Sequence, residues 1–275
     1  MKPLDEHLCC PKCNRVGKVI FHQDFLDIRQ VTCGFCGYKL PVYNGIPDFA
    51  EHIVLSNPVF RPLQIFNNSR LFASLYESPW RLFLTVIGSG ISMKQEIQEV
   101  TGIAGKVSAH VLVDLACYTG FYTRAFAHKW PEALVYGLDI SLSMLEQARK
   151  VARRKGLKSI VFLRGDLYRL PFNDESIDYV NCGGALHLFS NLRPIWREIS
   201  RVLRPGGILG GWTLTWSPWA VYRKVQKWLM DHWKFTFLRP DQFAVGLSEV
   251  GLCAFKYRQR NAWLIFCATK NQLER

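Results

Sequence analysis

One ten-residue stretch constrains the fold of this chain more than any other. Residues 111–120 read Val-Leu-Val-Asp-Leu-Ala-Cys-Tyr-Thr-Gly, an apolar run that ends in small and polar residues. A run rich in Val and Leu is typical of a strand buried on both faces of a parallel sheet. The turn after such a strand opens a helix, and nucleotide-like ligands bind at the helix N-terminus. The stretch therefore predicts an α/β fold with a ligand site at the end of this strand.

A second acidic residue supports this interpretation. The apolar run at residues 133–138 ends at Asp139, which follows Asp114 by 25 residues. In dinucleotide-binding folds, an acidic residue about 20 residues after the glycine-rich turn accepts hydrogen bonds from the ribose. A lone Asp is also a common helix N-cap. Because Asp139 follows a second predicted strand, the ribose-binding role is favoured over the N-cap role.

Four short blocks follow one another at the spacing of one domain: residues 113–120, 137–141, 165–172 and 203–207. They read Val-Asp-Leu-Ala-Cys-Tyr-Thr-Gly, Gly-Leu-Asp-Ile-Ser, Gly-Asp-Leu through Leu-Pro-Phe, and Leu-Arg-Pro-Gly-Gly. With these blocks, the chain from Val107 to Lys270 resembles the class I S-adenosylmethionine-dependent methyltransferases, especially the type 11 branch related to quinone-biosynthesis C-methyltransferases. The resemblance implies an α/β fold with a Rossmann-like, doubly wound sheet.

The resemblance also implies which residues bind S-adenosylmethionine. The turn from Asp114 to Gly120 wraps the methionine end, Asp139 accepts hydrogen bonds from the ribose, and Asp166 reads the adenine. A carboxylate suits the ribose because charge-assisted hydrogen bonds are roughly twice as strong as neutral ones. The predicted cofactor-binding residues are Asp114, Ala116, Tyr118, Gly120, Asp139, Ile140, Asp166, Leu167 and Cys182.

The turn departs from the family pattern Asp-x-Gly-x-Gly-x-Gly. Ala116 and Tyr118 occupy the first two glycine positions, and only Gly120 keeps its glycine. A positive φ costs a residue with a Cβ about 1 kcal/mol or more. Tyr118 is therefore expected either to weaken cofactor binding or to form a wall beside the cofactor or substrate. A non-catalytic binding protein with a degenerate cofactor loop is one alternative that follows.

Five of the nine cysteines lie in the first 36 residues. Cys10 and Cys13 form one C-x2-C pair, Cys33 and Cys36 form another, and 19 residues separate the pairs. This spacing is typical of a four-cysteine zinc site, with disulfides as the alternative. Short strands between the pairs predict a zinc ribbon with a structural Zn²⁺. A ribbon that reads nucleic acid is an alternative, and Cys9 is expected to stay outside the site.

Three segments follow from these patterns. Residues 1–50 are predicted as the zinc ribbon, 51–106 as a helical cap or lid, and 107–275 as the S-adenosylmethionine-binding methyltransferase domain. The cap is predicted from helical apolar spacing, for which ordinary packing is the alternative. The ribbon is expected to have a core separate from that of the sheet.

Composition limits the class of protein. The formal charge is +13, which predicts weak attraction to phosphates or anionic membranes. No transmembrane segment or signal peptide is expected, so the prediction is a cytoplasmic protein. The basic run at residues 149–155 is interpreted as the solvated outer face of a helix. The sequence leaves the oligomeric state open.

The acceptor is inferred from the later part of the chain. Residues 177–182 predict the fourth strand, and His187, just beyond it, is the candidate for catalytic proton transfer, with a structural role as the alternative. The aromatic stretch at 212–219 indicates a hydrophobic or aromatic small-molecule substrate, such as a quinone-like or specialised metabolite. Nucleic acid is a less favoured partner. The corresponding alternative function is a ribosomal RNA guanine methyltransferase, because one bacterial family of such enzymes joins a four-cysteine module to the same kind of domain.

Overall fold

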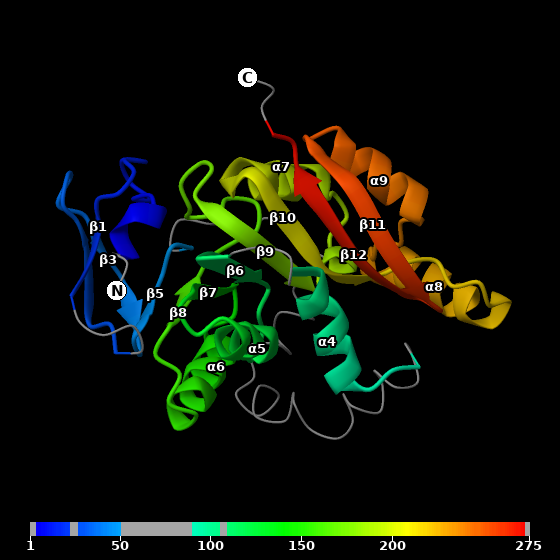
Figure 1. Ribbon diagram of the computed structural model, residues 1–275, viewed down its shortest axis with the longest axis horizontal. Helices are drawn as coiled ribbons and strands as arrows, with labels where there is room; N and C mark the ends of the chain where they lie inside the picture. The colour runs from blue at the N-terminus through cyan, green and yellow to red at the C-terminus, as the bar shows by residue number, and fades with distance from the viewer. Residues whose placement is uncertain (1–3, 23–26, 51–89, 105–108, 273–275) are drawn as a thin grey trace.

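The computed structural model describes residues 4–22, 27–50, 90–104 and 109–272 (Figure 1). Most of the predicted helical cap, including every residue from 51 to 89, lies outside the described residues. The strands are β1 (Val19–His22), β2 (Gln30–Cys33), β3 (Lys39–Leu40), β4 (Val42–Tyr43), β5 (Ile46–Pro47), β6 (Val111–Leu115), β7 (Leu134–Asp139), β8 (Ile160–Arg164), β9 (Ile177–Gly183), β10 (Leu203–Leu214), β11 (Leu252–Arg260) and β12 (Trp263–Lys270). The helices are η1 (Leu4–His7), α4 (Met93–Ala104), α5 (Phe121–Lys129), α6 (Leu142–Arg154), η3 (Leu186–Leu188), α7 (Arg193–Val202), α8 (Ala220–Trp233) and α9 (Pro240–Ser248).

A seven-stranded sheet forms the centre of the molecule, in the order β11-β12-β10-β9-β6-β7-β8. Strands β8, β7, β6, β9 and β10 run parallel, and β12 pairs antiparallel with both β10 and β11. The carboxyl ends of the five parallel strands therefore meet at one edge, where ligands of open α/β sheets bind. The predicted doubly wound fold and the predicted fourth strand, β9, are confirmed.

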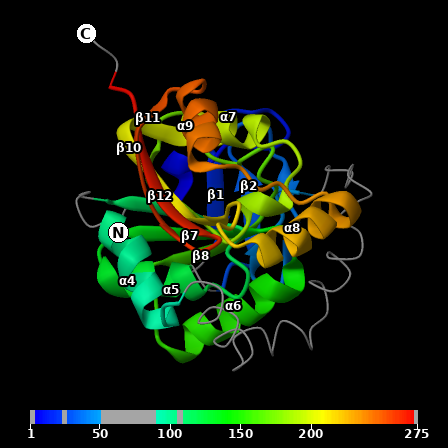
Figure 2. The ribbon, with the colours of Figure 1, turned by 90° about the vertical axis from the view of Figure 1, so that its right-hand side faces the viewer.

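Two apolar clusters cover the two faces of the sheet. Helices α7 and α9 lie on one face, and α4, α5 and α6 lie on the other (Figures 1 and 2). In α6, the buried residues follow helical spacing, so one stripe packs on the sheet while the opposite face meets solvent. The residues in this stripe are Met144, Leu145, Ala148 and Ala152.

The amino-terminal module is a three-stranded sheet, β1-β2-β3, followed by the hairpin β4-β5. Its buried side chains do not form a separate core, contrary to the expectation from the sequence. Leu8 and Phe49 belong to the cluster on one face of the main sheet, and Ile46 belongs to the cluster on the other. The module therefore wraps the β8 edge, because its few residues bury apolar area better against the sheet than alone.

Helix α4 is the described part of the predicted cap. It packs against α5, β10 and β12, so this helix belongs to the layer that covers one sheet face. Glu99 of α4 accepts hydrogen bonds from Arg260 at 2.9 Å and pairs with Arg258 at 3.2 Å, which fixes the helix to β11. Within the described residues, no helix has the length and apolar composition needed to cross a membrane.

Candidate cofactor site and cysteine cluster

The turn between β6 and α5 keeps a left-handed backbone although two of its three glycine positions hold other residues. The φ angles are +50° at Ala116, +50° at Tyr118 and +74° at Gly120. The Tyr118 N–H donates to Asp139 Oδ2 at 2.9 Å, and the Cys117 N–H donates to the Leu138 carbonyl at 3.0 Å. These bonds to the end of β7 offset the backbone strain at the turn.

Gly120 is the turn position where a side chain has no room. A Cβ built there would lie 3.0 Å from Ala148 of α6 and 3.1 Å from the Phe162 ring of β8. Its positive φ also favours glycine. The third glycine of the turn is thus fixed by packing, whereas the positions of Ala116 and Tyr118 accept a Cβ.

Asp139 lies at the carboxyl end of β7 and is buried. Its Oδ1 accepts from the Ser141 N–H at 2.8 Å, and its Oδ2 accepts from the Tyr118 N–H at 2.9 Å. Burial raises the pKa of this carboxyl, and the backbone donors act in the opposite direction. Each carboxylate oxygen offers about two lone-pair sites. Acceptor capacity remains on the carboxylate in addition to these backbone bonds, so the group can accept from ribose hydroxyls.

Asp114 occupies the end of β6 and is held by two buried side chains. Thr123 Oγ1 donates to its Oδ2 at 2.6 Å, and Asn181 Nδ2 donates to its Oδ1 at 2.7 Å. Burial raises the pKa of Asp114 to about 6. The Oδ1 atom of Asn181 is buried and has no hydrogen-bond partner among the described residues. Asn181 was not predicted as a site residue, although an amide inside the apolar run of β9 was a usable signal.

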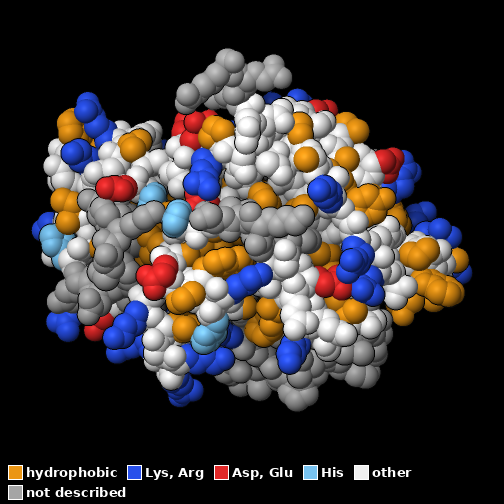
Figure 3. All heavy atoms as spheres, viewed as in Figure 1, with side chains coloured by type: hydrophobic (Ala, Val, Ile, Leu, Met, Phe, Trp, Pro, Cys, Tyr) orange, Lys and Arg blue, Asp and Glu red, His pale blue; other side chains and the backbone are white. Residues whose placement is uncertain are grey.

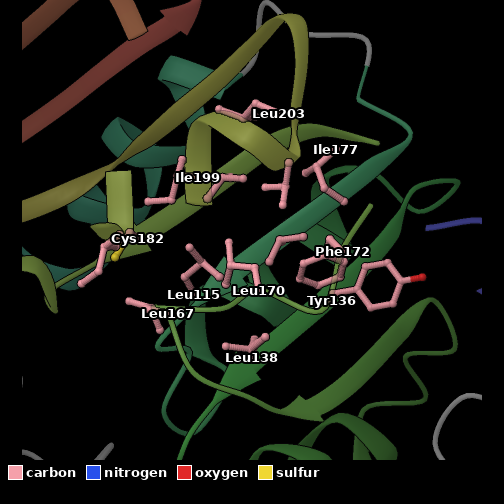
Figure 4. Packing of buried hydrophobic residues seen from close by; sticks show 14 of the residues in the cluster. Leu115, Tyr136, Leu138, Leu167, Leu170, Phe172, Ile177, Cys182, Ile199 and Leu203 are labelled. Atoms are coloured by element: carbon pink, nitrogen blue, oxygen red, sulfur yellow. The ribbon is translucent and has the colours of Figure 1, made fainter. Parts of the chain in front are cut away.

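Three further predicted residues follow β8 and β9. Asp166 is half-buried and accepts from the Tyr168 N–H at 3.1 Å, and burial raises its pKa. Leu167 and Cys182 are buried in the core, where Figure 4 shows their side chains beside Leu115. Any contact of Leu167 or Cys182 with a ligand must therefore come from the backbone.

His187 is buried just beyond β9, among aromatic rings. Its ring centroid lies 5.7 Å from that of Phe235 and 6.4 Å from that of Trp212, and Trp212 stacks on Trp263 at 4.9 Å. Its Nδ1 lies 3.3 Å from Thr213 Oγ1. Burial lowers the pKa of His187 to about 3, so the imidazole is neutral at physiological pH and a weak proton acceptor.

The Trp212 ring lies against the glycines that end β9. A Cβ at Gly184 would lie 2.5 Å from this ring, and one at Gly183 would lie 3.4 Å from Trp212 Nε1. That indole nitrogen is buried and has no partner among the described residues. The carboxyl end of β9 thus carries a buried cluster of aromatic rings, in which Trp212 Nε1 and Trp263 Nε1 have no hydrogen-bond partner among the described residues.

The amino-terminal module reaches the cofactor site through an ion pair that was not predicted from the sequence. Asp48, 2% exposed, accepts from Arg164 Nη1 at 2.7 Å, and Arg164 Nε donates to the Ile140 carbonyl at 3.0 Å. The Phe49 N–H also donates to the Arg164 carbonyl at 2.9 Å. Ile140 directly follows Asp139, so the module helps to fix the loop that holds the predicted ribose acceptor.

The basic run of α6 also meets this module, which corrects its interpretation as a fully solvated face. Arg149 Nη2 lies 3.0 Å from Asp27 Oδ1, and its guanidinium fills the space beside Gly45. Burial lowers the pKa of Arg149. Arg153 and Arg154 remain exposed, as predicted.

The four predicted metal ligands come together in one cluster. The Sγ atoms of Cys10, Cys13, Cys33 and Cys36 all lie within 4.8 Å of one another. Cys10 and Cys36 are separated by 3.7 Å, and Cys13 and Cys33 by 3.8 Å. A tetrahedral site with Zn–S bonds of about 2.3 Å requires sulfurs roughly 3.8 Å apart. The separations fit such a site and exclude disulfides, whose S–S distance is about 2 Å.

Known proteins with similar sequences and structures are methyltransferases. Residues 113–210 match the family model described as a methyltransferase domain. An uncharacterized chloroplastic methyltransferase of Arabidopsis thaliana, At1g78140, is 30% identical over 88% of this chain and 71% of that protein. The demethylmenaquinone methyltransferase of Geobacillus stearothermophilus is 37% identical over 35% of this chain and 42% of that protein.

A solved structure shows the same fold. It is phosphoethanolamine N-methyltransferase 2 of Haemonchus contortus in complex with S-adenosyl-L-methionine. The match has a TM-score of 0.66 and 15% identity, and it covers 80% of this chain and 61% of that one. At this identity the likeness concerns the fold alone.

Proposed function

Since this chain belongs to the S-adenosylmethionine-dependent methyltransferases, we propose that its methyl acceptor is a hydrophobic or aromatic small molecule, such as a quinone-like or specialised metabolite. The observation that carries this proposal is the aromatic cluster of His187, Trp212 and Phe235 at the carboxyl end of β9. A ring-shaped acceptor packs well against such rings. The demethylmenaquinone methyltransferase among the relatives supports a quinone-like acceptor.

The proposed cofactor site uses the predicted residues in roles that fit their contacts. Asp139 would accept the ribose hydroxyls, and the turn from Asp114 to Gly120 would hold the methionine end. Asp166 would accept from the adenine amino group, with Ile140, Leu167 and Cys182 contributing backbone. A cation near Asp114 would favour its ionised form, because an opposite charge lowers a carboxyl pKa.

The proposed chemistry needs few groups of the protein. Bound S-adenosylmethionine supplies an activated methyl group, so the site must align the acceptor and exclude water. Trp212 Nε1, which is buried and unsatisfied among the described residues, is suited to donate to an oxygen of the acceptor. His187 would orient the acceptor as a neutral ring; its pKa of about 3 makes proton abstraction a secondary role.

We also propose that Cys10, Cys13, Cys33 and Cys36 hold one structural Zn²⁺. The sulfur separations support this, as does the complete set of four thiolates, which leaves no open coordination position for catalysis. Cys9 lies outside the cluster, and its burial raises the pKa of its thiol. Zinc would stabilise the module that carries Asp48.

The proposed cofactor site is tested by measuring the binding of S-adenosylmethionine. Asp139→Ala should weaken binding of S-adenosylmethionine by roughly ten- to a hundredfold in calorimetry, because a charged hydrogen bond contributes ~1.5–3 kcal/mol. Asp231→Ala, on an exposed surface of α8, is the matched control and should leave the Kd unchanged. An unchanged Kd in folded Asp139→Ala would contradict the proposed site.

The acceptor class is tested with methyl-labelled cofactor against lipophilic quinols and phenols in one arm and ribosomal RNA in the other. Label should enter the organic phase and persist at 200 mM salt, because few phosphates are neutralised. An RNA acceptor would instead lose affinity steeply, with each phosphate contact adding about −0.7 to −0.9 to the log–log slope. Arg153→Glu with Arg154→Glu should leave turnover nearly intact. Labelled RNA together with loss of activity in that variant would contradict the proposal.

A further inference from the structure

Helix α8 has the reverse of the usual amphipathic arrangement. Its Val221, Val225 and Trp228 side chains are 75%, 55% and 49% exposed. The one side chain of the helix that is buried belongs to the polar Gln226. Residues spaced by three and four lie on one helix face, so the three apolar side chains form a continuous outward stripe. A surface helix ordinarily turns such a stripe toward the core.

Gln226 explains how the helix is held in this orientation. Its Oε1 accepts from the Ser217 N–H at 2.9 Å, and its Nε2 donates to the Thr215 carbonyl at 2.8 Å. Both partners lie just after β10. The amide therefore fixes the inner face of α8 to the segment that follows β10. The apolar stripe faces away from the protein.

Basic side chains lie to one side of the apolar stripe. Arg223, Lys224 and Lys227 are exposed on α8, Lys234 follows its last turn, and Asp231 is the one acidic residue of the helix. Trp219, the N-cap residue, is 61% exposed. Figure 3 shows hydrophobic and basic side chains together at the α8 end of the molecule.

Aromatic rings connect α8 with the proposed acceptor site. The ring of Trp233, in the last turn of the helix, lies 6.4 Å from that of Phe235, which lies 5.7 Å from His187. The last turn of α8 is thus linked through Phe235 to the aromatic cluster at the end of β9.

We propose that α8 docks this protein on the surface of an anionic lipid bilayer. A helix that combines Trp and aliphatic side chains with flanking Lys and Arg binds in the headgroup region, with its apolar side chains inserted and its cations beside lipid phosphates. Trp and Tyr favour this interface because their rings are amphipathic. The helix lies along the membrane and does not span it.

Charge favours a bilayer over a second copy of this chain. A symmetric dimer through α8 would place the same patch on both partners, so Lys224 and Lys227 of each copy would face like charges. An anionic surface instead attracts every one of these cations. The inference goes beyond the proposed acceptor, because docking does not require a particular substrate.

The test is co-sedimentation of the full chain with vesicles of phosphatidylcholine alone or mixed in equal parts with phosphatidylglycerol. The protein should bind the anionic vesicles and leave the neutral ones largely in solution. Lys224→Glu with Lys227→Glu should lower the partition coefficient at least about twentyfold, since each basic residue near an anionic surface contributes a factor of about five. Val225→Ser with Trp228→Ser should lower it by about tenfold or more.

Matched controls lie elsewhere on the surface. Arg154→Glu with Lys155→Glu makes the same charge change at the end of α6, and Val16→Ser with Val245→Ser removes equally exposed apolar side chains. Both should bind vesicles nearly as the unaltered protein does. Absence of binding to anionic vesicles would overturn the proposal, and so would equal loss in the controls. Sedimentation showing a dimer that Trp228→Ser converts to monomer, with vesicle binding unchanged, would assign α8 to self-association.

Discussion

The two ends of the central sheet differ in whether their apolar side chains are covered by the rest of the chain. At the β8 edge, the amino-terminal module covers both faces through Leu8, Phe49 and Ile46 and continues the backbone hydrogen bonding of the sheet at Arg164. At the other end, α8 leaves apolar and aromatic side chains in solvent. An edge covered by the chain's own residues contributes to stability, whereas a region left open points to something outside the chain. Substitutions at each end should therefore differ in what they change.

The largest effect is expected from the cysteine cluster. Cys33→Ser should remove the metal and lower the free energy of unfolding by about 5 kcal/mol or more, because structural zinc binding is coupled to folding. Since the module shares its core with the sheet, the melting temperature of the whole protein should fall by about 10 °C or more. Calorimetry and elemental analysis measure both quantities.

Cys9→Ser is the control, because this thiol is adjacent to the cluster but outside it. It should keep one zinc per chain and nearly the full melting temperature. Protein purified without chelator that contains no zinc would refute the metal assignment. A two-step melt with an unshifted second transition in Cys33→Ser would show that the module unfolds independently.

A smaller effect is expected at the ion pair between the module and the cofactor loop. Asp48→Asn removes a buried charge and leaves Arg164 uncompensated, which should cost about 3 kcal/mol in denaturant unfolding and weaken cofactor binding. Asp27→Asn removes the exposed partner of Arg149 and should cost less than about 1 kcal/mol. Equal losses in the two variants would mean that burial of the pair does not matter.

The smallest of the three effects concerns His187, on the α8 side of the sheet. Its folded-state pKa of about 3 lies below the ordinary 6.5, so the stability it contributes is present above pH 6.5 and is lost as pH falls. Between pH 7 and pH 5, the unaltered protein should lose about 2 kcal/mol relative to His187→Gln. Denaturant unfolding at both pH values measures this difference.

Asp114 acts in the opposite direction, because its folded-state pKa is raised to about 6 and acidification through that value stabilises the folded protein. Asp114 is present in both the unaltered protein and His187→Gln, so its contribution cancels when their stabilities are compared. His22→Gln, at an exposed position of β1, is the control and should behave like the unaltered protein. Parallel pH curves for the unaltered protein and His187→Gln would contradict the burial argument.

The sequence predicted the parts of the molecule that depend on local patterns. The apolar run before Asp114, the second strand ending at Asp139 and the pairs of cysteines all have short-range spacing that limits their structure. The left-handed backbone at Tyr118 was foreseen only as a cost. Its compensation comes from Asp139, 21 residues away, which no local pattern reveals.

Features that depend on distant parts of the chain were missed or misread. The contact of Asp48 with Arg164 joins residues 116 positions apart, and the partner of Arg149 is 122 positions away. The sequence also could not distinguish rings that pack beside the candidate site, such as the buried Trp212, from rings that face solvent, such as Trp228 on α8. Composition indicates that rings are numerous, but only the packing of Gln226 determines which of them face solvent.

The contact between Asp48 and Arg164 also bears on how this enzyme would respond to its surroundings. A zinc ion bound in the cysteine cluster would take no part in the reaction, but it would stabilise the segment that positions the loop after Asp139. Loss of the metal would then lower methyl transfer indirectly, because the Asp48 carboxylate, the Arg164 guanidinium and the Ile140 carbonyl connect the module to the cofactor loop. Apoprotein should accordingly lose cofactor affinity before it loses its central sheet, and metal supply would set how much of the protein is competent to react.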